Sequence, residues 1–266
     1  MFRGFAVGVT ETVPGVSGST VAMVLGIYER LIESLSLLTT KERRKAYPFL
    51  VIFGIGMVIG FGCSLFLIDF LLTSYRMPTL VFFIGIIVGF IPFLWNETVV
   101  RTEGKLTFHH YCIVLVFISL VVFLQSFTGI GHIDVQNLTF THYFLFLGAG
   151  FLASTALVLP GISGALILTI LGLYELAKDA LLSIHIPIVL SIGSGVVLGV
   201  LISSKFIRFL LENYQAETYC AMVGLVTGSI YAIAQNIHLK PSISMFFLSL
   251  LTLILGIGVS LRLMQR

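Results

Sequence analysis

Charge is the first thing this sequence has little of. Only 10% of its 266 residues are Asp, Glu, Lys or Arg, whereas 58% are hydrophobic. The mean hydropathy of +1.08 lies far above the range of soluble domains. This shortage of charge excludes an ordinary soluble protein and predicts an all-α polytopic membrane protein. With a net charge of only +3, we expect the lipid bilayer as a partner and no nucleic acid.

Cysteine is scarce too, and its placement is uninformative for chemistry. The three cysteines, Cys63, Cys112 and Cys220, all lie in apolar runs, which excludes a disulfide framework and favours buried thiols. The six histidines are scattered, and the adjacent pair His109–His110 cannot share one helical face. We therefore expect no metal site and no cofactor.

What the sequence does have is a polar interruption that occurs twice. Residues 11–20 read Glu-Thr-Val-Pro-Gly-Val-Ser-Gly-Ser-Thr, and residues 160–164 repeat the core as Pro-Gly-Ile-Ser-Gly. The echo continues downstream, where Leu-Gly-Ile-Tyr-Glu at 25–29 matches Leu-Gly-Leu-Tyr-Glu at 171–175. Such breaks within apolar sequence predict two helix-breaking loops at membrane depth, the usual site of function in a transporter.

Apolar runs around these loops predict the same organisation in both halves. Each half begins with a re-entrant helical hairpin, over residues 1–38 and 141–183, whose returning helices are predicted from Ser17 to Leu38 and from Ser163 to Ser183. Whether the hairpin arms span the membrane stays open. Three segments of the length needed to cross a bilayer follow each hairpin: 46–73, 77–95 and 107–127, then 187–211, 216–235 and 242–263.

The two halves align without a gap over a long stretch, with Pro48 matching Pro187 and glycines matching at the same offset. Generic small-residue packing of membrane helices does not explain a constant offset. We therefore predict repeats over 1–128 and 129–266, in a single membrane domain. Each repeat crosses an odd number of times, so the second is inverted relative to the first.

The basic residues agree with this inverted topology. If the N-terminus is inside, the outer side holds only Arg76, Lys178 and Lys240, and the other twelve of the 15 Lys and Arg residues are inside. This is the positive-inside pattern. We expect both termini of a multi-pass plasma membrane protein to be cytoplasmic.

The motif's chemistry suits an anion. Ser17 and Ser163 stand where a helix restarts, so each is a candidate N-cap, and the free amides of the next turn form an anion site. Glycines allow close approach of the backbone to a ligand. The second copy replaces Ser19 and Thr20 with Ala165 and Leu166, so the first is the richer site. Predicted substrate-binding residues are Glu11, Pro14, Gly15, Ser17, Gly18, Ser19, Thr20, Pro160, Gly161, Ser163, Gly164 and Arg208.

Ionisable residues near the motif leave alternatives open. Glu11 is costly within a membrane unless it has a task; it could carry a coupling proton, or lie hydrated at the surface. The cation that meets an anionic substrate could be Arg208, Lys205 or Arg3. Glu29 and Glu175 mark helix ends at the interface or have a function of their own.

Residues 11–20 together with Leu25–Glu29 resemble the bacterial polyprenyl-phosphate transporter (PopT-like) family, and the likeness covers essentially the whole chain. The resemblance implies a translocase (flippase) for undecaprenyl phosphate, which returns this lipid carrier from the outer to the inner leaflet for cell-envelope glycan synthesis. The polyprenyl-phosphate lipid is then the partner. The coupling ion, the direction, the chain-length preference and the oligomeric state, a homo-oligomer included, stay open.

Two other functions remain as alternatives. One is a secondary transporter of a small soluble anion, which needs the same frame without the lipid. The other is an enzyme, because undecaprenyl-pyrophosphate phosphatase resembles this chain in pairing inverted repeats with a Pro-Gly-x-Ser-Arg-Ser motif. Here residues 160–165 read Pro-Gly-Ile-Ser-Gly-Ala and lack that arginine, so we expect a transporter and no catalytic residue.

Overall fold

The computed structural model describes residues 1–13, 15–126, 139–237 and 243–264. Within these ranges every regular element is a helix, twelve in number, which confirms the all-α prediction. Three predicted features lie outside the described residues: Pro14, the boundary between residues 128 and 129, and the loop at 129–137.

Seven described helices are long and apolar enough to cross a membrane, so the chain is a multi-pass membrane protein. Six of them correspond to the six predicted spans, with ends shifted by a few residues. The seventh is the first arm of the second hairpin. The seven are α4 (Arg43–Ser74), α5 (Arg76–Arg101), α6 (Phe108–Gln125), α7 (Phe140–Val158), α10 (Ile186–Asn213), α11 (Gln215–Ala234) and α12 (Ile243–Met264).

The first arms of the two hairpins differ in length. The first arm is α1 (Phe2–Thr10), whose nine residues reach about 14 Å at 1.5 Å per residue, about half of a bilayer core. The corresponding arm of the second half is α7, whose 19 residues make it a candidate span. The two hairpins therefore have first arms of unequal length, and by length that of the second hairpin can cross a membrane.

The prediction of one continuous returning helix in each hairpin is wrong. The first return consists of α2 (Gly18–Val24) and α3 (Tyr28–Leu37), and the second of α8 (Gly164–Ile170) and α9 (Tyr174–Leu182). The breaks fall at Gly26 and Gly172, whose φ angles of +64° and +69° lie in the left-handed region that glycine adopts without steric cost. Each return is thereby two short helices separated by a glycine turn.

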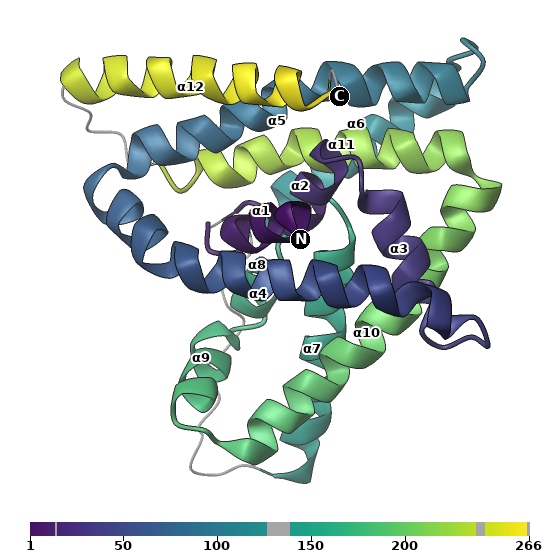
Figure 1. Cartoon of the computed structure of the whole chain (residues 1–266), viewed down its shortest axis with the longest axis vertical. Helices are drawn as coiled ribbons and strands as arrows, with labels where there is room; N and C mark the ends of the chain where they lie inside the picture. Colours follow the sequence, from purple (N-terminus) through teal and green to yellow (C-terminus); the bar gives the residue numbers. More distant parts are fainter. Residues whose placement is uncertain (14, 127–138, 238–242, 265–266) are drawn as a thin grey trace.

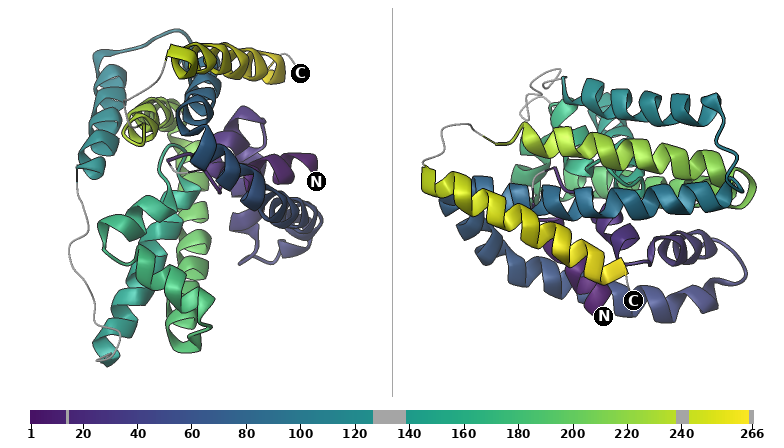
Figure 2. Two further views of the ribbon diagram at one scale, coloured as in Figure 1. Left: turned by 90° about the vertical axis from the view of Figure 1, so that its left-hand side faces the viewer. Right: turned by 90° about the horizontal axis from the view of Figure 1, so that it is seen from above.

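Corresponding helices pack in corresponding pairs. Helix α1 packs on α4 as α7 packs on α10, and α5 packs on α12 as α11 packs on α6. Figure 1 shows α5, α11 and α12 running side by side across one end of the molecule, with the short helices α1, α2 and α8 near its centre. The views in Figure 2 show α12 lying along α5.

Glycines allow these pairs to approach closely. A Cβ on Gly56 or Gly60 of α4 would collide with the backbone oxygen of Met1, which caps α1, or of Phe5 in α1. A Cβ on Gly195 of α10 would collide with the Leu147 carbonyl of α7. Since Gly56 aligns with Gly195, glycines matched between the halves serve the same pairing of helices. Small residues at such crossings allow van der Waals packing, which drives helix association in lipid.

Large apolar side chains cover much of the outer surface, for example Phe66, which is 87% exposed on α4. In a membrane protein such side chains contact lipid tails. Helix α11 is the most buried of the seven candidate spans. It forms the wall against which the two motif loops are packed.

Candidate functional site

The two motif loops meet in the centre of the molecule. Thr20, of α2, accepts a hydrogen bond at its side-chain oxygen from the amide of Gly161 at 2.8 Å. Ser19 donates from its hydroxyl to the Leu159 carbonyl at 2.9 Å. A broken helix exposes backbone groups that hydrocarbon cannot satisfy, and here the hydroxyls of the first loop satisfy those of the second.

Tyr28 adds a third contact between the two halves. Its hydroxyl donates to the Val158 carbonyl at 3.0 Å, and both residues are buried. Val158 is the last residue of α7, so its carbonyl has no partner within its own helix. The sequence reasoning overlooked this role, although Tyr28 stands in the repeated Leu-Gly-x-Tyr-Glu signature.

Glycines hold both loops against α11. Gly15 and Gly161 have φ angles of +81° and +88°, a region that residues with a Cβ rarely adopt. A Cβ on Gly161 would also collide with the carbonyl of Leu225 in α11. Pro160 is buried just after the end of α7, and Gly164 begins α8. The two loops are thus fixed by backbone conformation as well as by hydrogen bonds.

Glu11 follows the last residue of α1, and its side chain reaches the start of α2. Its carboxylate accepts a hydrogen bond from the Gly18 amide at 3.1 Å, the first amide of α2. A Cβ on Gly18 would collide with that carboxylate, so only glycine allows the contact. Glu11 lies outside the seven candidate spans; burial raises the pKa of its carboxyl, and the Gly18 hydrogen bond opposes this shift. An acidic side chain therefore lies where the sequence predicts a bound anion.

The two serines stand at the predicted N-cap positions but do not cap through their side chains. The Ser17 hydroxyl lies 2.6 Å from that of Ser19. The Ser163 hydroxyl forms no hydrogen bond with any residue that the structure describes, and it lines a cavity. Direct head-group binding by these serines stays a prediction.

Two cavities meet at Glu11. The first, of about 390 Å³, is lined almost entirely by apolar side chains of α1, α3, α4 and the end of α7. The second, of about 430 Å³, lies between the two motif loops and the ends of α5 and α11 and is rich in polar groups. Glu11 lines both. One cavity therefore suits an apolar group and the other a polar group.

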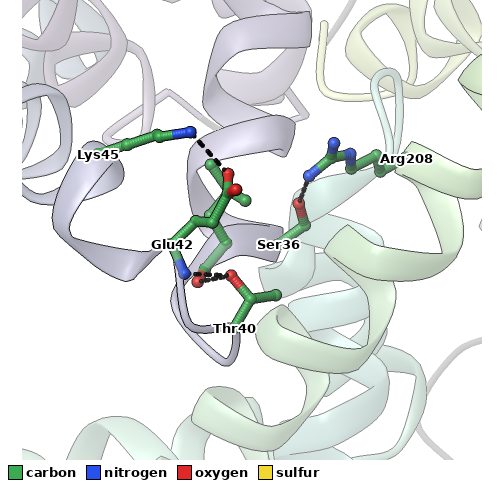
Figure 3. A network of polar contacts seen from close by, with 6 residues as sticks. Ser36, Thr40, Glu42, Lys45 and Arg208 are labelled. Carbon is green, nitrogen blue, oxygen red and sulfur yellow. Dashed lines mark hydrogen bonds and ion pairs between the residues drawn. The ribbon is translucent and has the colours of Figure 1, made fainter.

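The predicted cations do not reach these cavities. Arg208 of α10 binds the Glu212 carboxylate at 2.7 Å and the Ser36 hydroxyl at 3.1 Å. Figure 3 shows Arg208 pointing toward Ser36, beside the turn that carries Thr40 and Glu42. Arg208 lines a separate depression with Glu29 and Glu33.

Arg3 lines a further depression near the N-terminus. Among the described residues that line the two cavities at Glu11, the only Lys or Arg is Arg76. The sequence reasoning missed it, although it is one of just three basic residues on the predicted outer side.

Glu29 of α3 connects the first hairpin to α11 and α5. Its carboxylate accepts hydrogen bonds from the Tyr219 hydroxyl at 2.7 Å and from the Arg101 guanidinium at 3.2 Å. The guanidinium also lies 4.1 Å from the centre of the Tyr219 ring, a cation–π geometry. Its repeat counterpart Glu175 pairs instead with Lys178 of its own helix. The two glutamates of the repeated signature thus have different roles.

These features define a class of protein: a polytopic helical membrane protein in which two broken-helix loops meet between an apolar and a polar cavity. The family model described as undecaprenyl phosphate translocase-like matches residues 7–244, and the chain belongs to this family. A polyprenyl-phosphate transporter of Staphylococcus aureus (strain NCTC 8325 / PS 47) is 34% identical over 274 residues, covering 99% of this chain and 94% of the relative.

A second relative is similar over a smaller share of its length. A polyprenyl-phosphate transporter of Vibrio cholerae serotype O1 (strain ATCC 39315 / El Tor Inaba N16961) is 31% identical over 242 residues, which cover 86% of this chain and 74% of that relative. No solved structure matches the chain.

Proposed function

We propose that this protein translocates undecaprenyl phosphate between the leaflets of the bacterial plasma membrane, returning it from the outer to the inner leaflet. The family membership supports this proposal, as do two relatives named as polyprenyl-phosphate transporters. The structural observation that carries it is the meeting of an apolar and a polar cavity at Glu11. An amphipathic lipid needs both environments at once.

The repeats 1–128 and 129–266 and their inverted orientation are part of this proposal, with both termini cytoplasmic. The matched helix pairs support the duplication, because α1 on α4 corresponds to α7 on α10. Inverted repeats allow alternating access around a fixed site. Reporter fusions at Gly104, in the α5–α6 turn, and at the C-terminus test the orientation; cytoplasmic signals at both positions are expected, and an outer signal at either would refute it.

Head-group binding by the predicted motif residues also belongs to the proposal. The inward apolar groups of α3 and α4 would hold the first isoprene units, while the motif loops hold the phosphate. Of the hydroxyls predicted to bind substrate, Ser163 is the one best placed for this, because it lines the polar cavity. Ser17, Ser19 and Thr20 would act mainly by holding the two loops together, through the contacts already described.

Glu11 is the proposed coupling acid. It lines both cavities and accepts a hydrogen bond from the Gly18 amide. Its protonation and position would therefore change as the site opens to one side of the membrane or the other. Glu11→Gln keeps the shape and removes the charge. We expect this variant to lose the pH or membrane-potential dependence of transport; normal transport with unchanged dependence would refute the coupling role.

The function is tested in liposomes containing the purified protein. Undecaprenyl phosphate is placed in one leaflet, its distribution is followed, and free phosphate is assayed in parallel with the pyrophosphate form. We expect lipid movement that depends on the protein, without phosphate release. Phosphate release would favour an enzyme, and movement of inorganic phosphate without movement of the lipid would favour the small-anion transporter.

A further inference from the structure

The polar cavity between the motif loops holds an arginine that is free to bind an anion. Arg76 lines this cavity together with Thr12, Gln125, Ser163 and Asn236. Its Nε donates to the Asn236 carbonyl at 3.0 Å. Within the part of the chain that the structure describes, Arg76 forms no ion pair and its two terminal guanidinium nitrogens have no hydrogen-bond partner.

The Asn236 contact orients the Arg76 guanidinium. One edge of this planar group is fixed to the end of α11, which leaves its terminal nitrogens to bind a ligand. Such a fork matches two oxygens of a phosphate, and charge-assisted pairs of this kind are among the strongest hydrogen bonds in proteins. The other charged residue lining the cavity, Glu11, forms no ion pair with Arg76 and is held by the Gly18 amide. The positive charge of Arg76 is therefore not neutralised by this neighbour.

The start of α5 reinforces this positive charge. Arg76 is the first residue of a 26-residue helix whose first turn contains no acidic residue. The N-terminal end of a helix carries a partial positive charge, so a cation there is locally unfavourable and an anion favourable. The matching helix α11 begins instead with Gln215 and has Glu217 in its first turn. Only the first copy concentrates positive charge at this position.

We propose that Arg76 binds the phosphate monoester of the substrate in this cavity. The inference rests on the proposed function and names the residue that recognises the head group. Ser163 and Gln125 add uncharged donors along the same cavity. In the predicted topology Arg76 is on the outer side, so this site receives the lipid from the outer leaflet.

The test measures binding of farnesyl phosphate, farnesol and inorganic phosphate to the full chain in lipid nanodiscs by calorimetry. Loss of a charged hydrogen-bond partner weakens binding by about tenfold to hundredfold, so we expect Arg76→Gln to lose this much affinity for farnesyl phosphate and none for farnesol. Arg76→Lys, which keeps the charge without the fork, should fall between. Arg44→Gln, which removes an exposed arginine of α4 that lines neither cavity, is the control and should bind like the wild type.

The outcomes of this experiment distinguish failure of the proposed Arg76 site from failure of the proposed function. An Arg76→Gln protein with wild-type affinity for farnesyl phosphate would refute the site and leave the proposed function standing. Inorganic phosphate binding as tightly as farnesyl phosphate, with both lost in Arg76→Gln, would support the site but refute a lipid substrate. If Arg76→Gln does not fold, Arg76→Lys decides: affinity for farnesyl phosphate unchanged from wild type would refute the site.

Discussion

The hydrogen bond from the Gly161 amide to Thr20 gives the most direct test of how the two loops are held together. Thr20 is 2% exposed, and the two atoms lie 2.8 Å apart. Thr20→Val keeps the size and shape of the side chain but removes the acceptor. The Gly161 amide is then left buried without its partner, since the positive φ of Gly161 places it outside the hydrogen-bond pattern of α7 and α8.

The expected cost follows from that unpaired amide. A buried donor left without a partner costs about 1–3 kcal/mol, whereas hydrogen bonds between membrane helices average only about 0.6 kcal/mol because the unfolded chain finds other partners. Gly161 lies close against the Leu225 carbonyl of α11, so its backbone has little room to turn toward another acceptor. We therefore expect Thr20→Val to lower the free energy of unfolding by at least about 1 kcal/mol.

The assay is reversible unfolding of the purified protein in mixed micelles, followed by helical circular dichroism. Thr169→Val is the matched control, because the Thr169 hydroxyl only donates to the Ala165 carbonyl within its own helix and its side chain is exposed. The control should unfold like the wild type. If Thr20→Val is as stable as this control, the contact between the loops does not stabilise the fold and the reasoning fails.

Other substitutions test the packing of Gly161 on α11 and the contacts of Glu29 with Tyr219 and Arg101. Gly161→Ala should prevent accumulation of folded protein, because its Cβ would collide with the Leu225 carbonyl. Gly148→Ala is the control and should not lower stability, because there is open space around Gly148. Size-exclusion profiles of the two variants test this; equal amounts of folded protein would refute it. Glu29→Gln removes the charge and should destabilise by about 0.5–1 kcal/mol, a modest effect because Glu29 is half exposed. A stability equal to wild type in the same unfolding assay would show that its ion pair with Arg101 is dispensable.

The sequence by itself determined the class of protein and most of its helices. Long apolar runs fix spans such as α5 and α12 because hydrocarbon accepts only backbone that is bonded within its own segment. The repeated Pro-Gly-x-Ser-Gly motif located both loops, since proline and glycine interrupt helices wherever they occur together. The family resemblance rested on the same residues and was confirmed by the family match.

The breaks within the two returning arms could not be predicted from the local sequence. Apolar composition predicted continuous helices after Ser17 and Ser163, yet each return breaks at a glycine, Gly26 or Gly172. A glycine within an apolar run is compatible with either a helix or a turn. The choice depends on what the next segment contacts, and here Tyr28 is held by the carbonyl of Val158, far away in the sequence.

Only the tertiary structure decided which polar groups share a cavity. The sequence offered Arg208, Lys205 and Arg3 as cations, and the fold instead placed Arg76 beside Ser163 and Glu11. The fold also brings the Gly18 amide into a hydrogen bond with the Glu11 carboxylate, and the Gly161 amide into one with the Thr20 hydroxyl. Periodicity and composition report the neighbours of a residue along one segment, whereas these contacts join segments up to 141 positions apart and depend on how the two halves pack against each other.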